Sequence, residues 1–208
     1  MKVGVALLLV AACFATSGCS TSDRSAAPAA AAAAERSCPA AWKSGWQRLA
    51  NRISAPVYCP TWMPSPLTAL IGGPWDNGVS VDKRDRSYLV SFLYHESQTG
   101  DVHVNFRAYP GRTRIPTCTD VQTGAGRPHR TTVPCFADPH GHRRVRGIDA
   151  TVYTVNQDAD QWHVLYAWRK GGSLYTVSEH VAKPLTFRQV VRNLDRLLRG
   201  LVVVKPSA

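Results

Sequence analysis

Apolar residues recur at steps of three and four between positions 187 and 201, which is the period of one helical face. They are Phe187, Val190, Val191, Leu194, Leu197, Leu198 and Leu201, and the opposite side carries Arg188, Arg192, Arg196 and Arg199. Thr186 and Gln189 have the spacing of a capping box, and Gly200 stands where a left-handed residue often ends a helix. We expect an amphipathic helix whose arginines form a solvated outer face, with binding of an anionic partner as the alternative.

A β-hairpin is predicted directly before this helix. Residues 162–168 and 174–178 are rich in aromatic and β-branched side chains, and Gly171-Gly172 between them suits a tight turn. One face of the first strand would carry Trp162, Val164, Tyr166 and Trp168. Large aromatic residues beside an amphipathic helix usually belong to the core, so we expect a buried face, with a platform for an apolar ligand as the alternative.

Alternating patterns upstream predict further strands at 88–95, 102–109 and 150–156. In the second of these, apolar residues alternate with His103, Asn105, Arg107 and Tyr109, which is typical of a half-buried strand. The connections between neighbouring strands are short, and short turns favour antiparallel pairing.

A first helix is expected over 38–53, where Trp42, Trp46, Leu49 and Ile53 mark one face. Residues 56–74 hold five prolines and a Gly-Gly pair, so this stretch is expected to be irregular. Together the patterns predict an α+β fold. It is an antiparallel meander of five or six strands, with an N-terminal and a C-terminal helix packed on one face.

The N-terminus carries the pattern of an export signal. Lys2 precedes the apolar stretch 3–14, which is too short for a membrane span, and Gly18-Cys19 follows. This segment resembles bacterial lipoprotein signal peptides, although Thr16 departs from the usual aliphatic residue. The resemblance implies that Cys19 receives a diacylglyceryl group and palmitate. It also implies that residues 1–18 are removed and that the protein is anchored on the extracytoplasmic face of the cell membrane. An ordinary signal peptide without a lipid is the alternative.

Residues 19–37 are rich in Ser, Pro and Ala and are predicted to form a lipidated flexible tether, followed by a single domain over 38–205. The order of signal, Ala/Pro tether, Cys-Pro-rich segment and antiparallel sheet resembles uncharacterised secreted lipoproteins of high-GC Gram-positive bacteria. This resemblance supports the fold and the location, and it implies no catalytic residue.

Cysteine usage agrees with export. Cleavage before Cys19 leaves an even set, Cys38, Cys59, Cys118 and Cys135, for which disulfides are the default in an oxidising compartment. Neighbours in sequence favour Cys38–Cys59 and Cys118–Cys135, although four cysteines allow three pairings. A zinc site is the rival hypothesis, but no close Cys-x-x-Cys pair is present.

Net charge and loop composition indicate the kind of partner. The formal net charge is +11, which favours an anionic envelope polymer, lipid or protein, and export makes nucleic acid an unexpected partner.

Residues 111–147 are predicted to be a long loop, which is usually functional or disordered. A possible anion-binding loop is formed here by Arg127, His129, Arg130, His140, His142, Arg143, Arg144 and Arg146. A solvated loop is the competing interpretation, and His140-Gly141-His142 also suggests copper or zinc.

No motif of a nucleophile elbow, a zinc protease or a cofactor site is present, so neither a catalytic residue nor a cofactor is predicted. Two functional hypotheses remain. The first is a non-catalytic, membrane-anchored binding module for an anionic envelope component or partner protein. The second is a sensor or interaction domain that recognises an apolar ligand through the aromatic sheet face, for which a solvent-exposed Trp62, Trp162 or Trp168 beside a cleft would be the sign.

Overall fold

The computed structural model describes residues 36–67, 79–96, 100–122, 127–156 and 162–207. The helices among them are α1 (Ala40–Ile53) and α2 (Phe187–Arg199). The strands are β1 (Val57–Pro60), β2 (Val79–Val81), β3 (Tyr88–Glu96), β4 (Gly100–Tyr109), β5 (Thr117–Gln122), β6 (His129–Pro134), β7 (Pro139–Val145), β8 (Ile148–Val155), β9 (His163–Lys170), β10 (Ser173–His180) and β11 (Leu201–Val204). The predicted signal peptide and the tether up to residue 35 lie outside the described residues.

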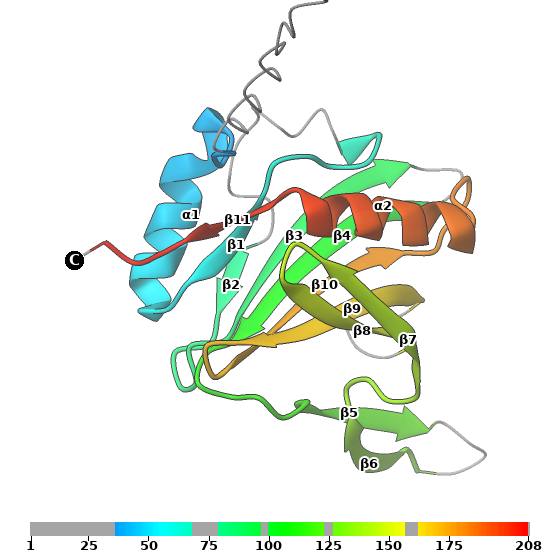
Figure 1. Ribbon diagram of the computed structural model, residues 1–208. Coiled ribbons are helices and arrows are strands. Elements are labelled where there is room, and N and C mark those ends of the chain that lie inside the picture. Colours follow the sequence, from blue (N-terminus) through cyan, green and yellow to red (C-terminus); the bar gives the residue numbers. More distant parts are fainter. Residues whose placement is uncertain (1–35, 68–78, 97–99, 123–126, 157–161, 208) are drawn as a thin grey trace, which may run out of the picture. The chain divides into compact units, whose positions relative to one another are not determined.

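The main sheet has seven strands in the order β2-β3-β4-β10-β9-β8-β7, and its neighbours are antiparallel (Figure 1). The predicted combination of an antiparallel sheet with two helices is confirmed. The sheet is larger than the five or six strands expected, and it is not one continuous meander. Two runs of neighbouring strands, β2-β3-β4 and β7-β8-β9-β10, join where β4 pairs with β10.

The hairpin of β9 and β10 has the predicted two-residue turn. Lys170 pairs with Ser173, and Gly171 and Gly172 both have positive φ, at 56° and 74°. Those angles fit a type I′ turn, whose twist matches the twist of the flanking strands. The turn therefore sets the register of the two central strands of the sheet.

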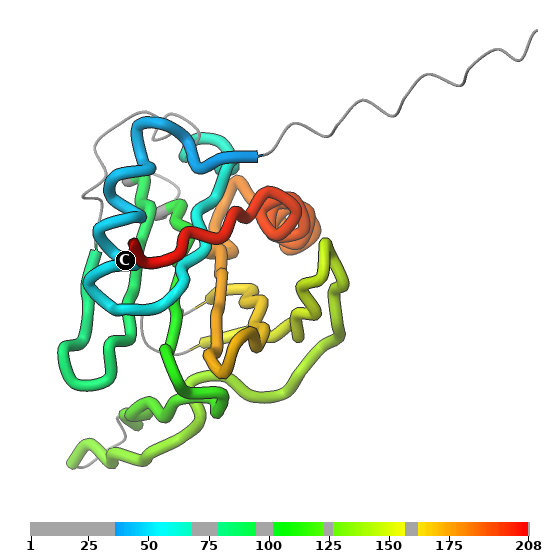
Figure 2. The backbone as a smooth tube through the Cα atoms, turned by 60° about the vertical axis from the view of Figure 1, so that its left-hand side comes forward, coloured from blue at the N-terminus to red at the C-terminus, as the bar shows by residue number. Residues whose placement is uncertain are grey.

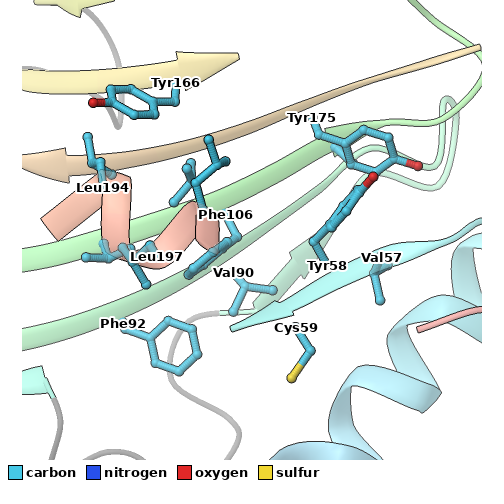
Figure 3. Close-up of a cluster of buried hydrophobic side chains, with 14 of the residues drawn as sticks. Val57, Tyr58, Cys59, Val90, Phe92, Phe106, Tyr166, Tyr175, Leu194 and Leu197 are labelled. Atoms are coloured by element: carbon cyan, nitrogen blue, oxygen red, sulfur yellow. The ribbon is translucent and has the colours of Figure 1, made fainter. Parts of the chain in front are cut away.

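One face of the sheet forms the main core. Phe106 of β4 lies opposite Val177 of β10, and Val177 lies opposite Tyr166 of β9, so all three side chains share that face. Trp46 of α1 meets Phe106 edge-on with ring centroids 5.9 Å apart, and the Tyr166 hydroxyl reaches α2. Figure 3 shows side chains of α2 among this cluster. Burial of these large rings removes apolar surface from water and stabilises the packing of both helices on the sheet.

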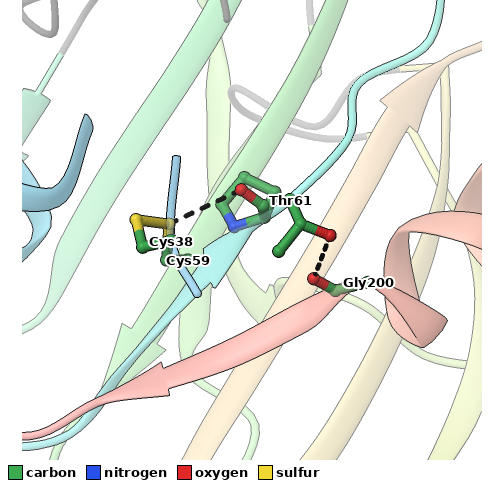
Figure 4. Close-up of a disulfide and its surroundings, with 5 residues drawn as sticks. Cys38, Cys59, Thr61 and Gly200 are labelled. Carbon is green, nitrogen blue, oxygen red and sulfur yellow. Dashed lines mark hydrogen bonds between the residues drawn. A yellow bond between two sulfur atoms is a disulfide. The ribbon is translucent and has the colours of Figure 1, made fainter. Parts of the chain in front are cut away.

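The two ends of the domain are tied together. β1 pairs with β11, and the disulfide Cys38–Cys59 links the segment before α1 to β1 (Figure 4). Thr61 donates from its hydroxyl to the Gly200 carbonyl at 2.8 Å. The expectation of a left-handed Gly200 is wrong, because its φ is −95°. Glycine is required there by space instead, since a Cβ would lie 2.8 Å from the Thr61 hydroxyl oxygen.

The long loop predicted over residues 111–147 is wrong, because most of its described part is strand. β5 and β6 form a separate two-stranded ribbon with Cys118–Cys135 across it, and β7 is an edge strand of the main sheet. Figures 1 and 2 both show this ribbon apart from the main sheet. The polar composition of 111–147 concealed these strands because their side chains are mostly exposed.

The second face of the main sheet is also buried at its centre, although the alternation along residues 102–109 predicted a strand with one exposed side. Asn105 is only 2% exposed, and Ser178 and Thr176 of β10 are also buried on this face. A smaller apolar cluster lies on the same side, formed by Phe136, Tyr153, Val155, Leu165, Ala167 and Leu174. Both faces of the central strands are therefore interior. Neither helix among the described residues is long and apolar enough to cross a membrane.

Candidate binding surfaces

The structure divides the predicted anion-binding residues between two places. Arg127, His129 and Arg130 lie at one end of the β5–β6 ribbon, at or just before the start of β6. The others lie on β7 or in the turn after it, namely His140, His142, Arg143, Arg144 and Arg146. The eight side chains therefore do not form one cluster on one loop.

The charges of β7 are largely engaged by groups of the same chain. Arg144 Nε lies 3.1 Å from Asp149 Oδ2, and Arg143 Nε lies 3.3 Å from Asp195 Oδ1. Charged side chains on an edge strand also oppose pairing with another chain. The geometry thus gives the β7 basic residues a structural role, and binding of an anion at this segment stays a prediction.

The outer face of α2 differs from β7. Arg188, Arg192, Arg196 and Arg199, hereafter the α2 arginine row, are all exposed. No carboxylate among the described residues pairs with any of them. Arg196 instead lies over the ring of Trp62, 4.0 Å from the ring centroid. The row is a surface of uncompensated positive charge.

An apolar pocket of about 310 Å³ lies between the start of α2 and the adjoining ends of β8, β9 and β10. Val155, Val164 and Val181 contribute to its lining, and Trp162 and Phe187 line it with largely exposed side chains. Trp162 is 61% exposed and Phe187 is 51% exposed. Exposed large aromatic side chains beside an apolar hollow are typical of a binding site. We call this feature the Trp162–Phe187 pocket.

The backbone at Trp162 is unusual. Its φ is +59°, a region that bulky residues rarely adopt, and its carbonyl accepts a hydrogen bond from Val181 N–H at 2.8 Å. The sequence pattern placed Trp162 on a common buried face with Tyr166 and Trp168, and this was wrong for Trp162. It precedes β9 and is exposed, whereas Tyr166 and Trp168 are buried. The aromatic sheet face is therefore covered, and the exposed aromatic residues lie at the strand ends.

Glu179 is a buried acid next to the pocket lining. Its cross-strand neighbour is Val164, which lines the pocket, and its side chain is fully buried. Asn193 of α2 donates to Oε1 at 2.8 Å, while Oε2 has no hydrogen-bond partner among the described residues. Burial raises the pKa of Glu179 to about 8, and the bond from Asn193 offsets this only in part. The side chain is therefore mainly protonated at neutral pH.

Three histidines from three strands meet on the second face of the sheet. The ring centroid of His103 lies 4.5 Å from that of His163 and 4.7 Å from that of His180, and His163 and His180 are 5.2 Å apart. Sequence reasoning missed this cluster, because only the registers of β4, β9 and β10 bring these positions together. Among the described residues, no group of His, Cys, Asp or Glu has the arrangement of a metal site.

Comparison with known proteins adds no relative. No family model, curated protein or solved structure matches the chain.

Proposed function

We propose that this protein is a non-catalytic binding domain, held on the extracytoplasmic face of the cell membrane by a lipid on Cys19, and that it takes an apolar group in the Trp162–Phe187 pocket. The location is supported by the lipoprotein-like signal and by the two disulfides, which persist in oxidising compartments. Recognition of an apolar ligand is the second of the two functional hypotheses above. The proposed site now lies at the ends of the strands instead of on the face of the sheet.

The observation that carries this proposal is the exposure of Trp162 and Phe187 at one apolar pocket. Water contact with two large aromatic rings is unfavourable, and a ligand that covers them would recover that free energy. The positive φ of Trp162 supports the same conclusion, because strained residues cluster at ligand sites. The pocket volume of about 310 Å³ is near the lower end of small-molecule sites.

Calorimetric titration with 1-decanol, an uncharged apolar probe, tests the pocket. Trp162→Ala and Phe187→Ser should each weaken binding at least about tenfold, since each removes one apolar contact surface. Trp62→Ala is the matched control, because Trp62 contacts Arg196 and does not line the pocket. Equal affinity in all four proteins would contradict the proposed site.

The mass of the intact protein extracted from native membranes tests the location. We expect the mass of residues 19–208 plus a lipid, and a gain of four protons when Cys38–Cys59 and Cys118–Cys135 are reduced. A cleaved chain without lipid would contradict the anchor and leave the pocket hypothesis standing.

A second candidate function is binding of an anionic envelope component, namely a polymer, a lipid or a protein. The α2 arginine row favours it, because its charges lack carboxylate partners among the described residues. Loss of binding as salt rises would be the expected signature of such an interaction.

A further inference from the structure

The first half of the α2 arginine row is arranged at the expense of helix stability, whereas Arg196 and Arg199 lie in the last turn, where positive charge suits the helix dipole. Arg188, Arg192 and Arg196 follow one another at four-residue steps, at which like charges repel. Arg188 also lies in the first turn, where a positive charge opposes the helix dipole, and that turn holds no acidic residue. The helix therefore tolerates two unfavourable electrostatic arrangements that its own fold does not require.

The one acidic residue of α2 does not relieve this repulsion. Asp195 accepts a hydrogen bond from the Tyr166 hydroxyl at 2.9 Å, and its Oδ1 lies 3.3 Å from Arg143 Nε of β7. Its charge is therefore used to hold α2 against the sheet. The outer row remains available to an anionic partner, and Figure 1 shows α2 lying across the front of the main sheet.

The predicted tether joins the domain beside this row. Arg36 is the first described residue, and its Nη1 donates to the Arg199 carbonyl at 2.8 Å, at the C-terminal end of α2. Only residues 20–35 separate it from Cys19. The flexible tether that the sequence predicts here would have a root-mean-square reach of roughly 20–25 Å. A lipid on Cys19 would thus keep this end of α2 close to the headgroups.

We infer that the α2 arginine row docks on an anionic phospholipid surface and orients the domain with α2 along the membrane. Guanidinium groups bind phosphate in a bidentate manner, and the half-buried Trp62 beneath Arg196 suits the headgroup region. Each basic residue near such a surface changes partitioning by about fivefold. The inference rests on the proposed membrane location and is independent of the pocket.

Vesicle sedimentation tests this docking. Residues 19–208 carrying Cys19→Ala, which lack both the apolar signal and the lipid acceptor, are mixed with phosphatidylcholine vesicles that contain or lack phosphatidylglycerol. We expect partitioning that requires phosphatidylglycerol and falls steeply with salt. Replacement of the four row arginines by Gln should reduce it more than about a hundredfold.

A control variant with the same loss of charge separates a specific surface from net charge alone. Lys43, Arg48, Lys83 and Arg84, which are exposed and lie outside both basic surfaces, are replaced by Gln instead. Partitioning should then stay within about threefold of the parent at moderate salt, where distant charges are screened. Thermal unfolding of both variants checks that each is folded. An equal loss in the two variants would overturn the inference, as would the absence of phosphatidylglycerol-dependent partitioning.

Inorganic polyphosphate serves as a soluble polyanion probe. Row-dependent binding to polyphosphate without binding to vesicles would overturn the membrane as partner and assign the row to a soluble polyanion. Decanol titration and the mass of the native protein are read separately. Vesicle sedimentation reports docking, decanol titration reports the pocket, and the mass of the native protein reports the lipid anchor, so a negative result for one leaves the other two standing.

Discussion

Strand β7 and helix α2 both carry several arginines, yet their charges have different environments. On β7, Arg144 lies opposite Asp149 of β8 in the strand register and within 3.1 Å of its carboxylate. On α2, the neighbours of Arg192 at four-residue steps are Arg188 and Arg196. Arginine density in a sequence is therefore a poor guide to a binding surface, and the presence of a carboxylate partner is a better one.

The two elements reach this difference through their geometry. Cross-strand pairing places a residue of β8 directly beside Arg144 of β7, so the neighbouring strand supplies the opposite charge there, and Asp195 of α2 supplies the one beside Arg143. On the outer face of α2 the close neighbours of an arginine are helix residues at steps of three and four, together with the uncharged ring of Trp62 beside Arg196. Compensation on α2 would thus have to come from the helix itself, which has the single acid Asp195, or from another molecule.

The largest effect should come from Glu179, a buried carboxyl group with no opposite charge beside it among the described residues. The pKa of Glu179 is about 8 in the folded protein and 4.5 in the absence of burial. Between these values the unfolded chain ionises while the folded chain stays protonated, so the free energy of unfolding should fall as pH rises from about 4.5 to 8. Glu179→Gln should remove this slope and stabilise the protein by on the order of a few kcal/mol at pH 8 and above. Chemical denaturation across this pH range measures the effect.

Asp138→Asn provides the control for this measurement, since Asp138 is an exposed carboxylate. Its pH profile should match that of the parent. If the free energy of unfolding of Glu179→Gln still fell with pH as in the parent, the buried carboxyl would not be the cause of that fall. The contrast between charges with and without an opposite charge beside them would then lose its strongest support.

The next effect concerns a charge that has partners. Asp195→Ala removes the acceptor of the Tyr166 hydroxyl and the carboxylate beside Arg143, and should lower the free energy of unfolding by about 1–3 kcal/mol. Tyr166→Phe removes only the hydroxyl and should cost about 1 kcal/mol. Urea unfolding at neutral pH compares the two. A smaller loss in Asp195→Ala than in Tyr166→Phe would mean that the Arg143 contact contributes nothing.

Features encoded by near neighbours were predictable from the sequence. The capping box of Thr186 and Gln189 is present, with Thr186 N–H donating to Gln189 Oε1 at 2.8 Å. The glycine turn of the hairpin and both disulfides are confirmed as well. Each depends on residues that are adjacent in sequence or are the only close candidates, so local spacing was sufficient.

Features that depend on distant register were not predictable. The histidine cluster requires β4, β9 and β10 to pair in one particular register, and no periodicity of a single strand reveals it. Residues 111–147 were predicted as loop because β5, β6 and β7 expose most of their side chains, which removes the apolar alternation. Exposure of Trp162 was missed because its positive φ takes it out of the strand pattern.

The smallest effect should separate the two arginine regions most directly. Arg188→Glu places an acid at the start of α2 and removes a like charge from Arg192, so the free energy of unfolding should rise by about 0.5 kcal/mol. The same variant should bind phosphatidylglycerol vesicles less well. Arg144→Glu, the matched reversal on β7, sets a second carboxylate beside Asp149 and should lower stability by a similar amount. A stability gain in Arg188→Glu and a loss in Arg144→Glu, measured by thermal unfolding, would show that α2 keeps Arg188 at a cost in stability, which supports its retention for a partner. Equal signs would remove that argument.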